Sequence, residues 1–326
     1  MRKKFKTLDE QIDVLKSRGL KIPDEKRAKE YLLSNNYYNI INGYSKPFML
    51  EKEKYISTAT FDEICKLYFF DKELKQILFN AILDAEKHLK SIFTYYFAQE
   101  HQNQRAPYLD INSYNHAYSL EVAYLISKLD RLIKQNKKYE NNAISYYYKK
   151  YDDVPIWVLV DYIDFGTLIT LIKCVPDKVQ NKIAKELTSF IKKNNPEFSN
   201  HFPAQMMLSF IKNIHEIRNL CAHNKRLIYF NCRADSKYYK PIHSKYDISK
   251  NDIRTSTFVT FINLQCFISD HEYATLHNAI RKRMITLDKQ INSIPIELIL
   301  ASLGFPKDWH KSPKLYPQKS VDNIKD

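Results

Sequence analysis

Glycine is scarce in this chain of 326 residues, which contains only four: Gly19, Gly43, Gly166 and Gly304. They lie far apart in the sequence. The phosphate-binding loops of P-loop nucleotide hydrolases and of dinucleotide enzymes need clustered glycines. Neither class of enzyme is therefore expected, and the sequence predicts no cofactor.

Cysteine is also sparse and irregularly placed. The five cysteines are odd in number, and no two of them form a C-x-x-C pair. This argues against both a disulfide framework and a zinc ribbon, and a reducing cytoplasm is the simplest interpretation. His215-Glu216 and His271-Glu272 lack a second histidine at the spacing that a zinc-protease helix requires. No metal site is predicted.

No long uninterrupted apolar run is present. The most apolar stretch, residues 155–175, is interrupted by Asp161, Asp164 and Lys173, which favours a buried helix over a membrane span. The first residues, Met-Arg-Lys-Lys-Phe-Lys, have no apolar run behind them and do not form a secretory signal. No membrane partner is expected.

The chain carries a large excess of positive charge. Its 51 Lys and Arg residues against 37 Asp and Glu residues give a net charge of +14 and a pI near 9.3. Such an excess attracts polyanions, with nucleic acid the first candidate and an anionic membrane surface the second. A lysine-rich composition typical of an AT-rich genome is an equally good explanation. The charge alone therefore does not distinguish a surface that binds a polyanion from a general bias in composition.

Apolar residues recur at spacings of three and four along most of the chain, which predicts an all-α fold. Helices are expected at about 7–17, 23–33, 60–100, 120–134, 155–172, 177–193, 254–268, 271–289 and 295–303. In the fourth of these, the residues expected to face inward are Leu120, Tyr124, Leu125, Leu129, Leu132 and Ile133. We expect an N-terminal helical extension over 1–59, a core over 60–309 and a mobile polar tail over 310–326.

The stretch Arg218-Asn219-Leu220-Cys221-Ala222-His223 follows an amphipathic helical pattern. Arg218 lies at the edge of the apolar stripe, where a guanidinium must reach solvent or an anion. Asn219 and His223 are four residues apart, so they can share a helix face, and His215 lies one turn earlier. Arg218 and His223 are five apart. They converge only if the arginine wraps round or a second copy completes the site.

These residue types suit RNA cleavage by the RNA's own 2′-hydroxyl. Histidine titrates near neutral pH and can move the proton. Arginine stays charged and presents a planar fork to phosphate oxygens. Asparagine can fix the tautomer of the imidazole. This reaction requires no metal.

Arg-Asn-x3-His at the end of an amphipathic helix resembles the R-x4-6-H motif of HEPN-domain ribonucleases. The wider context resembles the Abi family of bacterial abortive-infection proteins, of the AbiD/AbiF kind. Four further stretches fit that family in order and, with the motif, cover most of residues 8–309. They are Ile22–Leu33 followed by Tyr37–Tyr44, Glu86–Ser91, Pro155–Leu159 followed by Asp164-Phe165-Gly166, and Leu303-Gly304-Phe305-Pro306.

The resemblance implies a HEPN-type bundle of four or five helices, and a toxin-like ribonuclease used in defence against phage. Arg218 would stabilise the phosphorane, His223 would move the proton and Asn219 would orient His223. Glu86, Lys90 and His215 would support the site. HEPN sites are typically composite, so a homodimer is expected. Abi genes often neighbour small structured RNAs, so an alternative is a module that holds a non-coding RNA with little turnover.

Several residues are candidates for RNA binding. Lys225 and Arg226 extend the basic character of the motif, and further candidates are Lys137, Lys138, Lys149, Lys150, Tyr37 and Tyr38. Basic residues interleaved with aromatic ones can hold phosphates and stack bases. The alternative for residues 134–151 is a partly packed helix with solvated lysines. The alternative for Arg218 and His223 is a structural pair, with the arginine bonded to a neighbouring helix and the histidine filling a notch.

Overall fold

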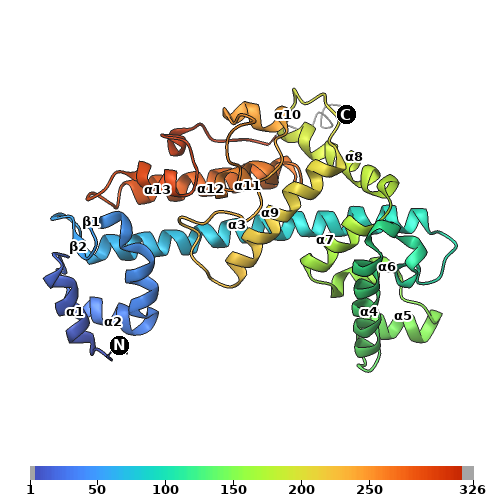
Figure 1. The fold of residues 1–326 in the computed structure, drawn as a ribbon, viewed down its shortest axis with the longest axis horizontal. Helices are drawn as coiled ribbons and strands as arrows, with labels where there is room; N and C mark the ends of the chain where they lie inside the picture. Colours follow the sequence, from blue (N-terminus) through green and yellow to red (C-terminus); the bar gives the residue numbers. More distant parts are fainter. Residues whose placement is uncertain (1–3, 318–326) are drawn as a thin grey trace, which may run out of the picture.

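The computed structural model describes residues 4–317, and it confirms the all-α prediction. The central element is α3, Phe61–Glu100, a single helix of 40 residues that spans about 60 Å at the usual rise per residue. It begins at a capping box in which Thr60 and Glu63 satisfy each other's backbone N–H groups. The other elements are arranged along its length (Figure 1).

The N-terminal end of α3 carries the extension expected for residues 1–59, of which residues 1–3 lie outside the described part. It contains α1 (Leu8–Ser17), α2 (Glu25–Asn35) and a π-helical turn at Tyr38–Asn42. A short antiparallel hairpin of β1 (Met49–Glu51) and β2 (Lys54–Tyr55) follows, which the sequence did not predict. Both helices begin where expected, because Thr7 and Asp24 accept hydrogen bonds from their first turns.

The opposite end of α3 carries α4 (Ser119–Asn136), α5 (Ala143–Tyr151), α6 (Ile156–Leu159) and α7 (Phe165–Cys174) (Figure 1). The single helix expected over 155–172 is wrong. Asp164 adopts an extended backbone and its side chain accepts from the Thr167 N–H, so a new helix begins there. Two short helices therefore replace one long one.

Two of the residues expected to face inward in α4 do not. Leu120 is 90% exposed and Tyr124 is 75% exposed. Leu125, Leu129 and Ile133 are buried as expected, and they form the stripe on which α4 packs against its neighbours. The buried stripe continues to Val122 in the first turn, so Leu120 and Tyr124 lie on another face of the correctly predicted helix.

The remaining helices cover α3 from its other side. α8 (Asp177–Asn194) and α9 (Ala204–Ala222) cross it, and α12 (Asp270–Asp288) runs alongside it (Figure 1). α10 (Lys240–His243), α11 (Thr257–Leu264) and α13 (Ile296–Ser302) complete this layer. Among residues 4–317, no helix combines the length and apolar character needed to cross a membrane.

The described part of the expected tail is held against α12. The Asn278 side chain donates to the Leu315 carbonyl at 2.7 Å and accepts from the Leu315 N–H at 3.0 Å. Leu315 is thus hydrogen-bonded to α12, and the mobility expected for the tail stays a prediction. Residues 318–326 of that tail lie outside the described part.

Candidate active site and basic pocket

The motif lies at the C-terminal end of α9. The apolar stripe of this helix, which includes Met207, Phe210, Ile211, Ile214 and Ile217, is buried as predicted. The helix ends in a Schellman motif, because Asn224 has a positive φ of 50° and the Lys225 N–H bonds back to the Leu220 carbonyl at 3.0 Å. His223 is the last residue before this reversal of the chain.

Arg218 has no anionic partner among residues 4–317. Its guanidinium lies over the Phe79 ring of α3, with the central carbon 5.8 Å from the ring centroid. Its Nη1 donates a long hydrogen bond of 3.4 Å to Asn219 Oδ1, and its buried Nε has no partner. An arginine that served only the fold would be expected to have these donors paired. The role of Arg218 in the site stays a prediction.

The amide of Asn219 bonds to His215 and not to His223. Asn219 Nδ2 donates to His215 Nε2 at 3.0 Å, which identifies Nε2 as the unprotonated ring nitrogen. Burial, and then the charge of Arg218, lower the pKa of His215, so this imidazole is neutral at pH 7. The expected orienting bond from Asn219 to His223 is absent from the described structure. The amide instead links His215 to Arg218.

His215 is fixed by a close approach of α7 to α9. Its ring packs edge-on against Phe165, with centroids 5.6 Å apart. A Cβ added to Gly166 would lie 3.3 Å from His215 Nε2 and 3.2 Å from Asp164 Oδ1. The absence of a side chain at Gly166 thus allows α7 to approach α9 closely at His215.

His223 is exposed, and its side chain makes no hydrogen bond within residues 4–317. It does not fill a notch, as the structural alternative required. Five residues of α-helix separate it from Arg218, which is about 7.5 Å along the axis and a rotation to another face. In one chain, the two side chains therefore diverge.

The segment that follows His223 is anchored by Asp71 of α3, which is fully buried. Its carboxylate accepts hydrogen bonds from the N–H groups of Leu227 and Ile228, at 3.1 and 3.0 Å, and from the Tyr44 hydroxyl at 2.7 Å. One turn along α3, Lys75 Nζ lies 3.2 Å from Asp71 and donates to Asn224 Oδ1 at 2.8 Å. These contacts hold the end of the motif on α3.

A cavity of about 400 Å³ opens beside this anchor. We call it the basic pocket. It is lined by Tyr38, Asn39, Asn42, Gly43, Tyr44, Tyr68, Lys75, Asn224, Lys225 and Arg226. The structure thus brings Lys225, Arg226 and Tyr38 together at one cavity, and RNA binding by them stays a prediction. Tyr37 is half-buried and does not line the pocket.

The sequence reasoning missed Asp71 and Lys75. A signal was available, because both residues occupy the buried face of a strongly periodic helix, where Leu67, Leu74 and Leu78 are also buried. A carboxylate and an ammonium four residues apart on such a face must be paired with each other or with buried polar groups. The family resemblance drew attention to Glu86 and Lys90 instead.

Glu86 and Lys90 form an ion pair of 3.1 Å on α3, and Glu86 Oε2 has no hydrogen-bond partner. They line a cavity of about 460 Å³ together with Trp157 and Asp161. Eleven residues of α3 separate Glu86 from Lys75, which is about 16 Å along the helix. The pair therefore lies on the His215 side of the site and away from the end of α9 that carries His223.

The other predicted RNA-binding lysines form a separate group around α5, which lies toward the C-terminal end of α3 (Figure 1). The basic pocket is lined by Tyr68 and Lys75 from the N-terminal half of that helix. Lys137 lies over the Tyr148 ring, Lys149 lies 3.7 Å from Glu140, and Lys150 Nζ donates to the Tyr146 hydroxyl at 3.2 Å. The expected basic residues thus make two groups rather than one continuous face.

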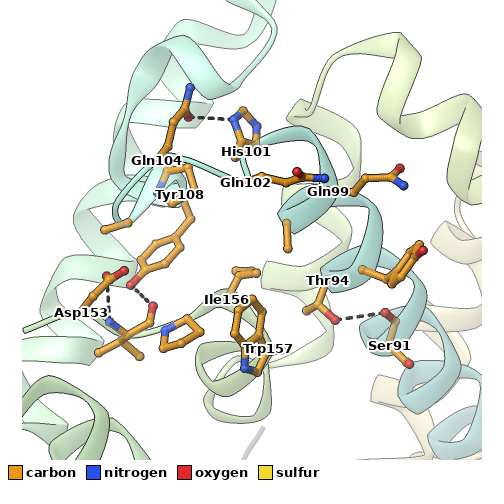
Figure 2. Close-up of a pocket in the computed structure, with 16 residues that line it drawn as sticks. Ser91, Thr94, Gln99, His101, Gln102, Gln104, Tyr108, Asp153, Ile156 and Trp157 are labelled. Carbon is orange, nitrogen blue, oxygen red and sulfur yellow. Dashed lines mark hydrogen bonds between the residues drawn. The ribbon is translucent and has the colours of Figure 1, made fainter. Parts of the chain in front are cut away.

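A cavity of about 740 Å³ lies beside α3 and α6 (Figure 2). Trp157, Tyr108 and His101 line it, and Asp153 is the only Asp, Glu, Lys or Arg residue among its walls. Because no lysine or arginine lines it, it has no fixed cation for a phosphate. The part of the chain that the structure describes contains no cluster of metal-ligating side chains.

The model of a family described as Abi-like protein matches residues 30–229. This range is well over half of the chain and includes the π-helical turn, α3 and the motif at the end of α9. Comparison with curated proteins found no match, and comparison with solved structures found none.

Proposed function

This chain belongs to the Abi-like protein family, which indicates a role in abortive infection and phage defence, and we propose that it performs this role by cutting RNA. The observation that carries the proposal is how few partners the Arg218 and His223 side chains have in the described structure. Arg218 has no anionic partner in the described structure, and His223 is exposed and unbonded beside a pocket with three cations. Cations placed in this way suit a phosphodiester.

In the proposed reaction, the 2′-hydroxyl of a ribose attacks the adjacent phosphorus. A new bond forms from O2′ to phosphorus, the bond from phosphorus to the 5′-oxygen breaks, and the proton of the 2′-hydroxyl is removed while the 5′-oxygen gains one. His223 moves the proton at one of these oxygens. Arg218 neutralises the phosphorane oxygens. The products are a 2′,3′-cyclic phosphate and a 5′-hydroxyl end.

Asn219 has a different role from the one expected from its spacing. Its amide joins neutral His215 to the guanidinium of Arg218. We therefore assign Asn219 and His215 to positioning Arg218. Glu86 and Lys90 stand further along α3 and belong to this supporting group, through the charge of Glu86 near His215.

A homodimer would complete the site. Arg218 and His223 point to different faces of α9, so one chain does not direct both at the same phosphate. A two-fold axis near the end of α9 would bring each Arg218 close to the His223 of the other copy.

Expression toxicity combined with mapping of RNA ends tests this function. Wild-type protein is expected to arrest growth and to leave new 5′-hydroxyl ends, and the double variant Arg218→Ala/His223→Ala is expected to do neither. Arg131→Ala/His116→Ala is a matched control, because both of its residues are exposed and lie outside the motif. Equal cleavage by the motif variant and the wild type would refute the assignment of the site.

An RNA-holding module is the second candidate, and the basic pocket is the observation that favours it. In that case the motif would serve binding, and a small structured RNA would occupy the protein with little turnover. Sequencing the RNA that co-purifies separates the two functions. A single dominant structured species, with wild-type and His223→Ala proteins equally harmless, would support the module.

A further inference from the structure

The walls of the basic pocket carry positive charge without lining carboxylates. Lys75, Lys225 and Arg226 line it, and no Asp or Glu does. Asp71 lies behind the wall. Its carboxylate accepts hydrogen bonds from two backbone N–H groups and the Tyr44 hydroxyl, and it forms an ion pair with Lys75. The pocket therefore presents cations to any molecule that enters it, and an anion is the ligand that suits it.

One of these cations is built into the structure. Lys75 is only 5% exposed, and its ammonium is fixed by Asp71 at 3.2 Å and by Asn224 at 2.8 Å. An ammonium has three N–H donors. Two of them are directed at these partners, so one remains for a ligand in the pocket. A lysine held in this way keeps its geometry before the ligand arrives, which lowers the entropic cost of binding.

The remaining walls suit the planar part of a nucleotide. Tyr38 is 69% exposed at the rim, while Tyr44 and Tyr68 pack edge-on to each other with centroids 5.4 Å apart. The side chains of Asn39 and Asn42 make no hydrogen bond within residues 4–317, so their amides are available to polar edges of a base. The π-helical turn presents all three of Tyr38, Asn39 and Asn42, and such turns are frequent at functional sites.

Gly43 keeps this space open. Its φ of −73° suits any residue, and a Cβ built on it would meet no atom within 4 Å. Neither backbone conformation nor packing therefore requires a glycine here. Because Gly43 lines the pocket and its carbonyl accepts a hydrogen bond from Arg226, a larger side chain at this position would occupy the cavity.

We propose that the basic pocket binds one nucleoside phosphate. The phosphate contacts Lys75, Lys225 and Arg226, and the base stacks on Tyr38 within reach of Asn39 and Asn42. A volume of about 400 Å³ lies in the range of small-molecule sites. Two sources share this chemistry: one nucleotide of an RNA chain, or a free nucleotide. The first source rests on the proposed function, because it makes the pocket a subsite for RNA that passes His223.

Binding measurements test the pocket independently of cleavage. We would use protein that carries His223→Ala and measure its affinity for adenosine 5′-monophosphate, for inorganic phosphate and for a short labelled single-stranded RNA. The nucleotide is expected to bind more tightly than phosphate, because stacking on an aromatic ring adds to the phosphate contacts. The affinities for the nucleotide and for inorganic phosphate are both expected to fall when Lys225→Gln/Arg226→Gln is introduced.

Two further variants separate the base from the phosphate. Tyr38→Ala removes an exposed ring without disturbing the core, and it is expected to weaken nucleotide binding about tenfold while phosphate binding is unchanged. Gly43→Leu fills the cavity and is expected to weaken the binding of both the nucleotide and phosphate. Lys250→Gln/Lys307→Gln is the matched control for charge, since both lysines are exposed and outside the pocket. It is expected to leave nucleotide affinity unchanged.

The RNA measurement identifies the source. If Gly43→Leu weakens both nucleotide and RNA binding, the occupant is a nucleotide of the RNA chain. If it weakens nucleotide binding alone, the occupant is a free nucleotide. If adenosine 5′-monophosphate does not bind, or binds wild type and Gly43→Leu equally, the proposal is overturned. Cleavage by otherwise wild-type protein is scored separately, so failure of the nuclease proposal remains distinguishable from failure of the pocket.

Discussion

At the scale of single residues, Asp71 links the fold to the candidate site. Its carboxylate is fully buried and accepts from two backbone N–H groups that lie just beyond the motif. Its neighbour Lys75 lines the basic pocket. A charge in this position is tolerated only because each of its oxygens is bonded. The same residue therefore stabilises the protein and sets the position of the chain after His223.

Replacing Asp71 with alanine should be strongly destabilising. The change leaves the buried ammonium of Lys75 without its counter-charge, so we expect the free energy of unfolding to fall by roughly 3–5 kcal/mol, measured by urea denaturation. The double variant Asp71→Asn/Lys75→Met removes both charges and should recover most of the loss. If Asp71→Ala unfolded like the wild type, the anchoring role would be refuted.

His243 predicts a pH dependence of stability. Burial lowers its pKa to about 4, from an ordinary value of 6.5, and its Nδ1 accepts from the Tyr239 N–H while Nε2 faces Asn263 Oδ1 at 3.0 Å. The unfolded chain takes up a proton near pH 6.5, whereas the folded protein does so only near pH 4. The stabilisation is therefore present above pH 6.5 and is lost progressively as the pH falls to about 4.

The size of this effect is about 3 kcal/mol. Denaturation of the wild type and of His243→Gln at several pH values measures it, because glutamine does not titrate. We expect the difference in stability between the two proteins to shrink from pH 7 to pH 4. A difference that stayed constant over this range would show that His243 is not held neutral by the fold.

At the scale of elements, the packing of α7 on α9 fixes the orientation of the motif helix. Gly166 lies at the contact, and Asp164 and His215 bound the space into which a side chain would project. Asp164 cannot yield easily, because Lys128 and Thr167 hold its carboxylate. His215 in turn bonds Asn219, so a shift at Gly166 would reach Arg218 through two contacts.

Gly166→Ala should therefore destabilise the protein by about 1 kcal/mol relative to Gly43→Ala, because the added methyl group overpacks the contact. Gly43 is the matched control, since its Cβ would meet open space at an ordinary φ. Thermal or urea unfolding of the two variants gives the comparison. RNA cleavage should fall for Gly166→Ala, because the shift at the contact reaches Arg218. Equal stability of both variants would contradict the close approach.

At the scale of the whole molecule, the predicted RNA-binding residues form two groups along α3. One is the basic pocket near its N-terminal half, and the other surrounds α5 near its C-terminal end (Figure 1). About 37 Å of α3 lies between Lys75 of the pocket and the C-terminal end of the helix at Glu100, which is several times the Debye length of about 8 Å at physiological salt. The two groups therefore act as separate surfaces toward a polyanion rather than as one.

Self-association should accompany activity. Sedimentation of active protein is expected to give twice the chain mass of 38.8 kDa, because Arg218 and His223 diverge within one chain. Mixing Arg218→Ala protein with His223→Ala protein should restore part of the cleavage that each has lost, since a mixed dimer holds one intact copy of each residue. Full activity in a protein that sediments only as monomer would exclude the composite site.

Much of the fold could be predicted from the sequence because helix signals are local. Thr7 and Thr60 open helices through capping boxes at the residues expected, and the stripe of α9 is buried as its spacing indicated. The long helix over 155–172 was wrong because an N-cap at Asp164 outweighed continuous hydrophobicity. Leu120 and Tyr124 were wrong because the buried stripe of α4 passes through Val122, Leu125 and Leu129, and apolar character alone does not show which face is buried.

The candidate site, like the fold, could be predicted from the sequence only in part. The sequence by itself determined the family and the all-α class, and it singled out Arg218, Asn219 and His223 as candidates, because these inferences depend on residue order and short-range periodicity. Only the tertiary structure decided that Asn219 bonds His215, that Glu86 lies about 16 Å along α3 from Lys75, and that Lys75 joins Lys225 and Tyr38 in one pocket. Those contacts join segments far apart in the chain, and packing, not local spacing, sets their geometry.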